Sequence, residues 1–183
     1  MKKDNIQCIE TNQTHLNSIL QVEELAFNSK EESMLVKNLL EDKTARPVVS
    51  LLAMHKKQAV GHILFTRAFI ENSPECRSYI LAPLAVVPSY QKQGIGGLLI
   101  REGLSRLRAM NVDYAFVLGH TEYYPKHGFI PDAAHSGFPA PYPIPEKDKD
   151  AWMMMKLNSG DLRKITGKGK CAVALDKPEY WRE

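Results

Sequence analysis

Residues 84–97 read LAVVPSYQKQGIGG, a stretch in which apolar residues give way to a glycine-containing turn. The apolar start is typical of a buried strand, and the residues after Gly94 show the spacing of a helix. Without side chains, Gly94 and Gly96 let backbone N–H groups approach a ligand, and the start of a helix carries partial positive charge. The segment therefore predicts an anion-binding turn, although the same glycines would also serve a tight turn with close helix packing.

Two familiar phosphate-binding loops do not fit this segment. A P-loop requires a GK[ST] triplet after its glycines, and none follows here. The pattern GxGxxG, which binds dinucleotides, fails because Leu99 occupies the place of its last glycine. Nucleotide hydrolysis and a Rossmann-type dinucleotide site are therefore not expected.

The residues around the segment predict a mixed α/β fold. Apolar or alternating patterns predict strands at 6–9, 48–54, 59–70, 78–87, 114–119 and 151–157, and helical spacing predicts helices at 15–27, 29–42 and 94–110. A short polar turn separates the second strand from the third, so these two should form an antiparallel hairpin. Residues 78–119 have the length of a βαβ crossover between parallel neighbours, so the sheet should be mixed.

The composition predicts one soluble domain that spans residues 1–183. A chain of 183 residues with 44% hydrophobic content can bury a single core. A proline-rich surface loop is expected at about 131–150, and residues 158–183 form a less patterned C-terminal extension. The formal net charge of +3 is too small to indicate a nucleic-acid or membrane partner. No stretch approaches the roughly 20 apolar residues that a membrane span requires.

The cysteine and histidine residues give no sign of a metal site or a disulfide framework. Cys8, Cys76 and Cys171 lie far apart and form no CxxC pair. The histidines are spread over different expected elements without the spacing of metal ligands. We therefore expect no metal, and a location in the reducing cytoplasm.

Two motifs resemble those of the GNAT superfamily of acyl-CoA-dependent N-acetyltransferases. Gln91, Gly94 and Gly96 fill the fixed positions of its motif A, a strand followed by Q/R-x-x-G-x-G/A. Residues 124–129 read YPKHGF and resemble its motif B, Y-x-x-x-G-F, at the expected place after the next strand. His127 departs from the family, which usually has an aromatic or aliphatic residue there. With the elements before them, the motifs cover about residues 6–129.

The resemblance implies a mixed sheet of about seven strands, splayed into a V and flanked by helices, with acetyl-CoA in the opening. In the family, the strand before motif A parts from its parallel neighbour, and its freed backbone bonds the pantetheine arm. Pro83 fits such a parting, because a proline within a strand is tolerated mainly at an edge or a bulge. The implied cofactor-binding residues are Leu84, Ala85, Val86, Gln91, Gln93, Gly94, Ile95, Gly96 and Gly97, with the backbone of the last five around the pyrophosphate.

The resemblance also implies direct transfer of the acetyl group to a primary amine of a small molecule or peptide through a ternary complex. Tyr124 matches the proton donor of the family, since a phenol pKa of about 10 lies close enough to that of a thiol to protonate the leaving sulfur. A buried tyrosine that only packs beside Gly128 and Phe129 is the structural alternative.

The general base is less evident, because no carboxylate occurs between Tyr79 and Val86, where some family members place a glutamate. His120 and Glu122 follow a predicted strand end and are the candidates, although each would also suit a capping or hydrogen-bonding role. Acidic residues such as Glu23 could attract a cationic acceptor. The alternative function is a noncatalytic acyl-CoA-binding sensor or regulatory module, and a homodimer is the commonest assembly for such proteins.

Overall fold

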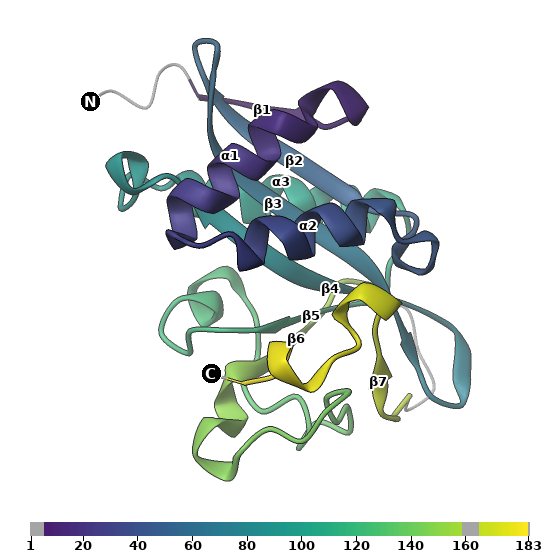
Figure 1. Cartoon of the computed structure of the whole chain (residues 1–183). Helices are drawn as coiled ribbons and strands as arrows, with labels where there is room; N and C mark the ends of the chain where they lie inside the picture. Colours follow the sequence, from purple (N-terminus) through teal and green to yellow (C-terminus); the bar gives the residue numbers. More distant parts are fainter. Residues whose placement is uncertain (1–5, 159–164, 183) are drawn as a thin grey trace.

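The centre of the molecule is a seven-stranded mixed sheet (Figure 1). The structure, a computed structural model, describes residues 6–158 and 165–182. The strands are β1 (Ile6–Glu10), β2 (Val49–His55), β3 (Gln58–Ile70), β4 (Ser73–Val86), β5 (Tyr114–Leu118), β6 (Trp152–Lys156) and β7 (Gly169–Lys170). They follow the order β1-β2-β3-β4-β5-β6, and β7 pairs with the end of β3. Among the strands of the described residues, β4 and β5 alone pair in parallel, which confirms the predicted mixed α/β sheet.

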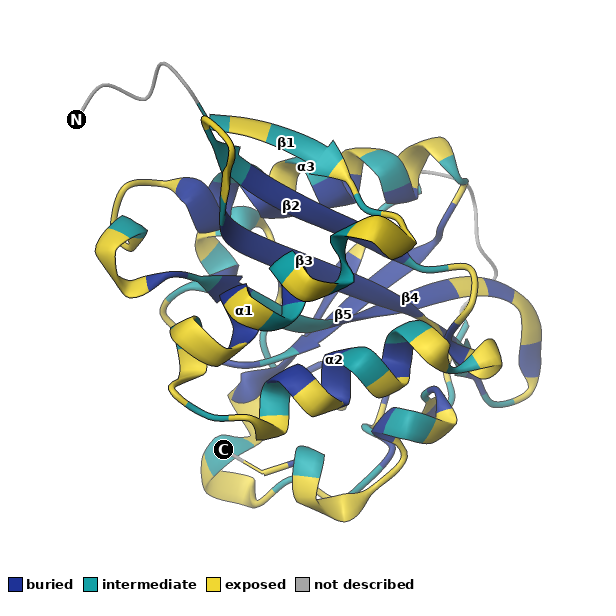
Figure 2. Ribbon diagram, turned by 45° about the horizontal axis from the view of Figure 1, so that its top comes forward, coloured by how far each residue is buried: buried dark blue, intermediate teal, exposed yellow. Residues whose placement is uncertain are grey.

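Helices cover both faces of the sheet (Figure 2). The two N-terminal helices, α1 (Leu16–Phe27) and α2 (Glu31–Glu41), lie on one face, and α3 (Ile95–Ala109) lies on the other. Successive side chains of β3 point to opposite faces of the sheet, so they enter two separate cores. Leu64 packs on the α1 and α2 side, and Phe65 packs on the α3 side. In the part of the chain that the structure describes, none of the helices has the length and apolar character that crossing a membrane requires.

The start of β4 differs from the sequence prediction. A strand was expected from about residue 78, but β4 begins at Ser73, directly after the turn that contains Asn72 with a φ of 62°. Its first residues pair with the end of β3 as a ribbon, in which Pro74, Glu75 and Arg77 are exposed. This polar and proline-containing stretch lacks the apolar pattern of a buried strand, so the prediction started too late.

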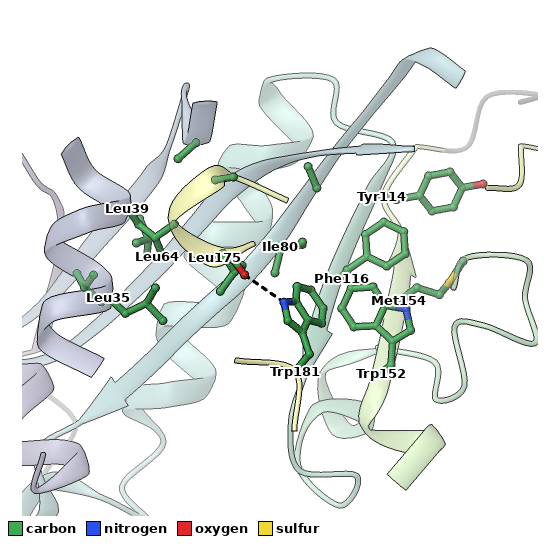
Figure 3. Close-up of a cluster of buried hydrophobic side chains, with 14 of the residues drawn as sticks. Leu35, Leu39, Leu64, Ile80, Tyr114, Phe116, Trp152, Met154, Leu175 and Trp181 are labelled. Atoms are coloured by element: carbon green, nitrogen blue, oxygen red, sulfur yellow. Dashed lines mark hydrogen bonds between the residues drawn. The ribbon is translucent and has the colours of Figure 1, made fainter. Parts of the chain in front are cut away.

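The C-terminal segment, here residues 165–182, packs on β5 and β6 (Figure 3). The indole ring of Trp181 is 2% exposed and meets the ring of Trp152 edge to face, with centroids 5.4 Å apart. Its Nε1–H donates to the carbonyl oxygen of Leu175 at 3.1 Å. Trp152 in turn stacks on Phe116 of β5 at 5.2 Å. The segment therefore contributes to the same core as the sheet.

Replacing Trp181 with alanine should lower the free energy of unfolding by about 3–5 kcal/mol, because it removes a large buried ring and leaves a cavity. Urea unfolding monitored by circular dichroism measures this loss. Val173→Ala is the control in the same segment; Val173 is 67% exposed, so its change should stay within about 0.5 kcal/mol. If both variants lost only a small and similar free energy of unfolding, the packing of the C-terminal segment on the core would be contradicted.

Candidate active site

The strands β4 and β5 part in the middle of the sheet. Their parallel pairing joins Ser78–Leu81 to Tyr114–Val117 and goes no further, although β4 continues along β3 to Val86. At the parting, Ala82 and Pro83 together oppose a single residue of β3, which is a one-residue bulge, and the peptide bond between them is cis. Pro83 therefore lies at the separation of the two strands, as the sequence predicted.

A cavity of about 670 Å³ opens beside this parting. Three segments form its wall: the end of β4, residues 90–96, and residues 120–126 after β5. Residues of motif A and residues of motif B, which are far apart in the sequence, thus line the same cavity. Lys92 and Lys126 lie on its wall and give the opening positive charge that suits an anionic ligand.

The start of α3 offers unbound backbone N–H groups to this cavity. Gly94 takes a φ of 84° and precedes α3 without a side-chain cap. The first backbone bond of the helix runs from the N–H of Leu98 to the carbonyl of Gly94, at 3.0 Å. Among the described residues, the N–H groups of Ile95, Gly96 and Gly97 have no acceptor outside the helix, as expected for a first turn. These amides and the helix dipole can hold a phosphate group.

Two glutamine side chains hold the turn that leads into α3. The Gln91 amide donates from Nε2 to the carbonyl of Val86 at 3.0 Å, tying the turn to the end of β4. The Gln93 amide donates in the same way to the carbonyl of Ser89, also at 3.0 Å. Both bonds are local, so the turn keeps its shape through its own residues.

The predicted cofactor-binding residues divide into two groups. Those on the cavity wall are Leu84, Val86, Gln91, Gly94, Ile95 and Gly96. Ala85 is buried with the α1 and α2 side, Gln93 is exposed with its amide bonded to Ser89, and Gly97 lies under the ring of His127. None of these three residues lines the cavity, so the cofactor contact predicted for them is one with the backbone.

Tyr124 and His120 both line the cavity. Tyr124 opens the short 3-10 turn Tyr124–His127, is 8% exposed and meets the ring of Phe129 edge to face at 5.8 Å. The missing side chain of Gly119 makes room for its ring, since a Cβ there would lie 2.6 Å from Cε2 of Tyr124. His120 is exposed, and its carbonyl accepts the N–H of Tyr124 at 3.3 Å. Glu122, the other candidate base, is exposed on the same wall.

Sequence reasoning missed Tyr123, which lies between the two motifs. Its hydroxyl is the atom nearest to the place that a Cβ of Gly96 would take, so the phenol reaches over the first turn of α3. Its ring meets the rings of Tyr124 at 5.3 Å and His127 at 5.0 Å. Burial raises the pKa of the Tyr123 phenol, which keeps the hydroxyl protonated as a donor. The sequence feature that could have indicated this residue is the pair of consecutive tyrosines, Tyr123 and Tyr124.

His127 packs beside the cationic side chains of Arg101 and Lys126. Burial and these two charges lower the pKa of His127, so its ring is neutral near pH 7. Its Cε1 would lie 2.9 Å from a Cβ at Gly97. The unusual residue of motif B therefore serves as a flat, uncharged cover against α3.

Among the described residues, neither a cluster of potential metal ligands nor a thiol with a lowered pKa is found. Across 6–158 and 165–182, no three His, Cys, Asp or Glu side chains gather in a way that could hold a metal ion. All three cysteines are free. Burial raises the pKa of Cys8 to about 11 and those of Cys76 and Cys171 to about 12, so these thiols stay protonated near neutral pH.

Sequence comparison agrees with this geometry. The sequence model described as "Acetyltransferase (GNAT) domain" matches residues 48–131, which include both motifs. The chain is 50% identical over 163 residues to the uncharacterized N-acetyltransferase YjhQ of Escherichia coli K12, and this match covers 88% of the chain and 90% of YjhQ. The chain belongs to the GNAT family of acetyltransferases.

Solved structures of the family share the fold. The structure of the GNAT family N-acetyltransferase YhbS from Escherichia coli in complex with CoA superposes with a TM-score of 0.84 at 23% identity, covering 95% of this chain and 93% of YhbS. A GNAT family acetyltransferase from Brucella melitensis, solved in complex with acetyl-CoA, gives a TM-score of 0.74 at 27% identity, covering 94% of this chain and 99% of that one.

Proposed function

We propose that this N-acetyltransferase moves the acetyl group of acetyl-CoA directly to a primary amine of a small molecule or peptide through a ternary complex. One observation carries the proposal: a single cavity joins the uncapped first turn of α3 to Tyr124 and His120. The Brucella melitensis relative, which was solved with acetyl-CoA, supports the choice of cosubstrate.

The residues of the cavity fit the parts of acetyl-CoA. The N–H groups of Ile95, Gly96 and Gly97 would hold the diphosphate, and the Tyr123 hydroxyl reaches over the same turn. The end of β4, freed from β5 beyond Leu81, would bond the pantetheine arm. Bound there, acetyl-CoA supplies an acetyl group activated as a thioester.

The reaction needs two proton transfers, and each is assigned to a different side chain of the cavity wall. Tyr124 is the general acid that protonates the leaving sulfur, because its phenol is held against the cavity by Gly119 and Phe129. His120 is the general base that takes the proton of the attacking amine, since its imidazole lines the same cavity as Tyr124. His120 is exposed and adjoins a second polar cavity of about 470 Å³, through which an acceptor can approach.

Turnover on a panel of amines tests this function. The enzyme is incubated with acetyl-CoA and, separately, with polyamines, amino acids, aminoglycosides and peptides that have free N-termini. We expect thiol release above the acceptor-free rate for at least one class, with the acetylated product seen by mass spectrometry. The matched control is the same acceptor with its amine already acetylated, which should give no release. Binding of acetyl-CoA without turnover on any amine would contradict the enzyme and favour a sensor.

A further inference from the structure

A hydrogen bond between two side chains connects the β2–β3 hairpin to the turn that leads into α3, residues 88–94. Nδ1 of His55 and the hydroxyl oxygen of Tyr90 are 2.9 Å apart, although 35 positions separate the two residues in the sequence. Their rings also meet edge to face, with centroids 5.6 Å apart. Either tautomer of His55 can form this bond, because a phenol both donates and accepts. The transfer reaction proposed above assigns no role to either residue.

The strand before this turn has a neighbour on one side only. Beyond Leu81, β4 pairs with β3 but, among the described strands, with no second one. The side-chain bonds of Gln91 and Gln93 join residues of the same segment, 86–93, so they give the turn its shape but do not fix its place against the rest of the sheet. That place depends on contacts with other elements.

His55 is itself held between two strands. It is the last residue of β2 and pairs with Ile6 of β1 on one side and with Gln58 of β3 on the other. The hairpin also contacts the start of the turn, because the backbone N–H of Val87 donates to the carbonyl of Val60 at 3.0 Å. The hairpin therefore holds the turn at two points, through its backbone and through the His55 side chain.

Tyr90 carries this connection to the proposed cofactor site. It lines the same cavity as Gln91, Lys92 and Gly94. Its ring packs against core residues on both faces of the sheet, so packing holds the ring and His55 holds the hydroxyl. Since Gly94 is four residues away, the place of Tyr90 limits the places that the first amides of α3 can take.

We propose that His55 is a positioning residue for acetyl-CoA binding, which acts through Tyr90 to keep the first amides of α3 where they meet the diphosphate. This role rests on the proposed function. Its physical basis is that a site already held in its bound arrangement loses less conformational freedom when the ligand binds. His55 does not line the cavity, so it should affect the affinity for acetyl-CoA and not the chemical step.

Calorimetric titration with acetyl-CoA in a double-mutant cycle tests this role. His55→Phe keeps a flat ring beside Tyr90 but removes the hydrogen bond, and we expect the dissociation constant to rise about 3-fold to 10-fold, the range of one net hydrogen bond. Tyr90→Phe removes the same bond from the other side and should cause a similar rise. The double variant should bind no more weakly than the weaker single variant, because both changes remove one shared bond. Additive losses, or unchanged affinity in His55→Phe, would overturn the proposal.

Two further variants separate the hydrogen bond from the packing of the ring. His55→Asn places an amide near the position of Nδ1 and should restore most of the affinity, whereas His135→Phe, at an exposed position outside the cavity, should leave it unchanged. At saturating acetyl-CoA, kcat of His55→Phe should equal that of the parent enzyme, with the change confined to KM for acetyl-CoA. If His55→Asn bound no better than His55→Phe, the role of the hydrogen bond would be overturned.

Hydrogen exchange in the cofactor-free chain measures how firmly the turn is held. Mass spectrometry should show faster exchange of the amides at 89–97 in His55→Phe, while rates outside the hairpin and the turn stay those of the parent enzyme. Faster exchange over the whole sheet would mean a general loss of stability and would overturn the positioning role. A parent enzyme that binds no acetyl-CoA would overturn the proposed function as well, whereas parent-like affinity and exchange in His55→Phe would overturn this inference alone.

Discussion

Replacing Gly96 with valine is expected to abolish binding of acetyl-CoA while the fold stays intact. A Cβ at this position would fall on the Tyr123 hydroxyl, which is the far end of a flexible side chain and can move aside. The valine itself would remain in front of the first amides of α3, where the diphosphate is proposed to bind. Calorimetric titration with acetyl-CoA measures the loss, and circular dichroism checks the fold.

The matched control for this variant is Ser105→Val, which places the same residue on an exposed position of the same helix. Valine and serine have nearly equal helix propensities, and this position lies away from the cavity, so the affinity of the variant for acetyl-CoA should equal that of the parent enzyme. Unchanged affinity in Gly96→Val would remove the diphosphate site from the start of α3.

Replacing Tyr124 with phenylalanine is expected to lower kcat roughly 10-fold to 1,000-fold, as for a lost general acid. The ring would keep its contacts with Phe129 and Gly119, so cofactor affinity should change little. Steady-state kinetics on the best amine of the panel measures kcat, and calorimetry measures the affinity.

The adjacent tyrosine supplies the control for this second prediction. Tyr123→Phe removes a hydroxyl that reaches over Gly96 and not the one assigned to the acid. It should weaken acetyl-CoA binding and leave kcat nearly unchanged. A Tyr124→Phe enzyme that works at full speed, or a loss of kcat in Tyr123→Phe alone, would move the acid role away from Tyr124.

The sequence was most informative where local chemistry determines the backbone. The order of apolar residues, turn and glycines at 84–97 predicted a strand, a turn and α3, because each of these depends on neighbouring residues. Pro83 likewise indicated the bulge, since a proline cannot complete the ladder at that position. The ribbon at the start of β4 escaped prediction because most of its residues are polar or exposed, and Cys76 is its one member of the core cluster.

Contacts between distant residues were beyond sequence reasoning. Glu23 was considered a charge that could attract an acceptor, but it is fully buried against His62, 39 residues further along the chain. The two residues meet only because α1 packs across β3, which no local pattern reveals. The reach of Tyr123 over Gly96 is hidden for the same reason, since it depends on how the turn after β5 meets α3.

The alternation of side chains along β3 restricts where insertions and deletions can occur in this chain during evolution. His62 and Leu64 face α1, while Ile63 and Phe65 face α3, and one inserted residue would exchange the two sets. An imidazole would then enter the apolar layer beneath α3, and Glu23 would lose its companion. Changes of length are therefore expected in turns such as the one at Lys56–Lys57, or at a bulge such as the one at Val60, where β3 already has one residue more than β2.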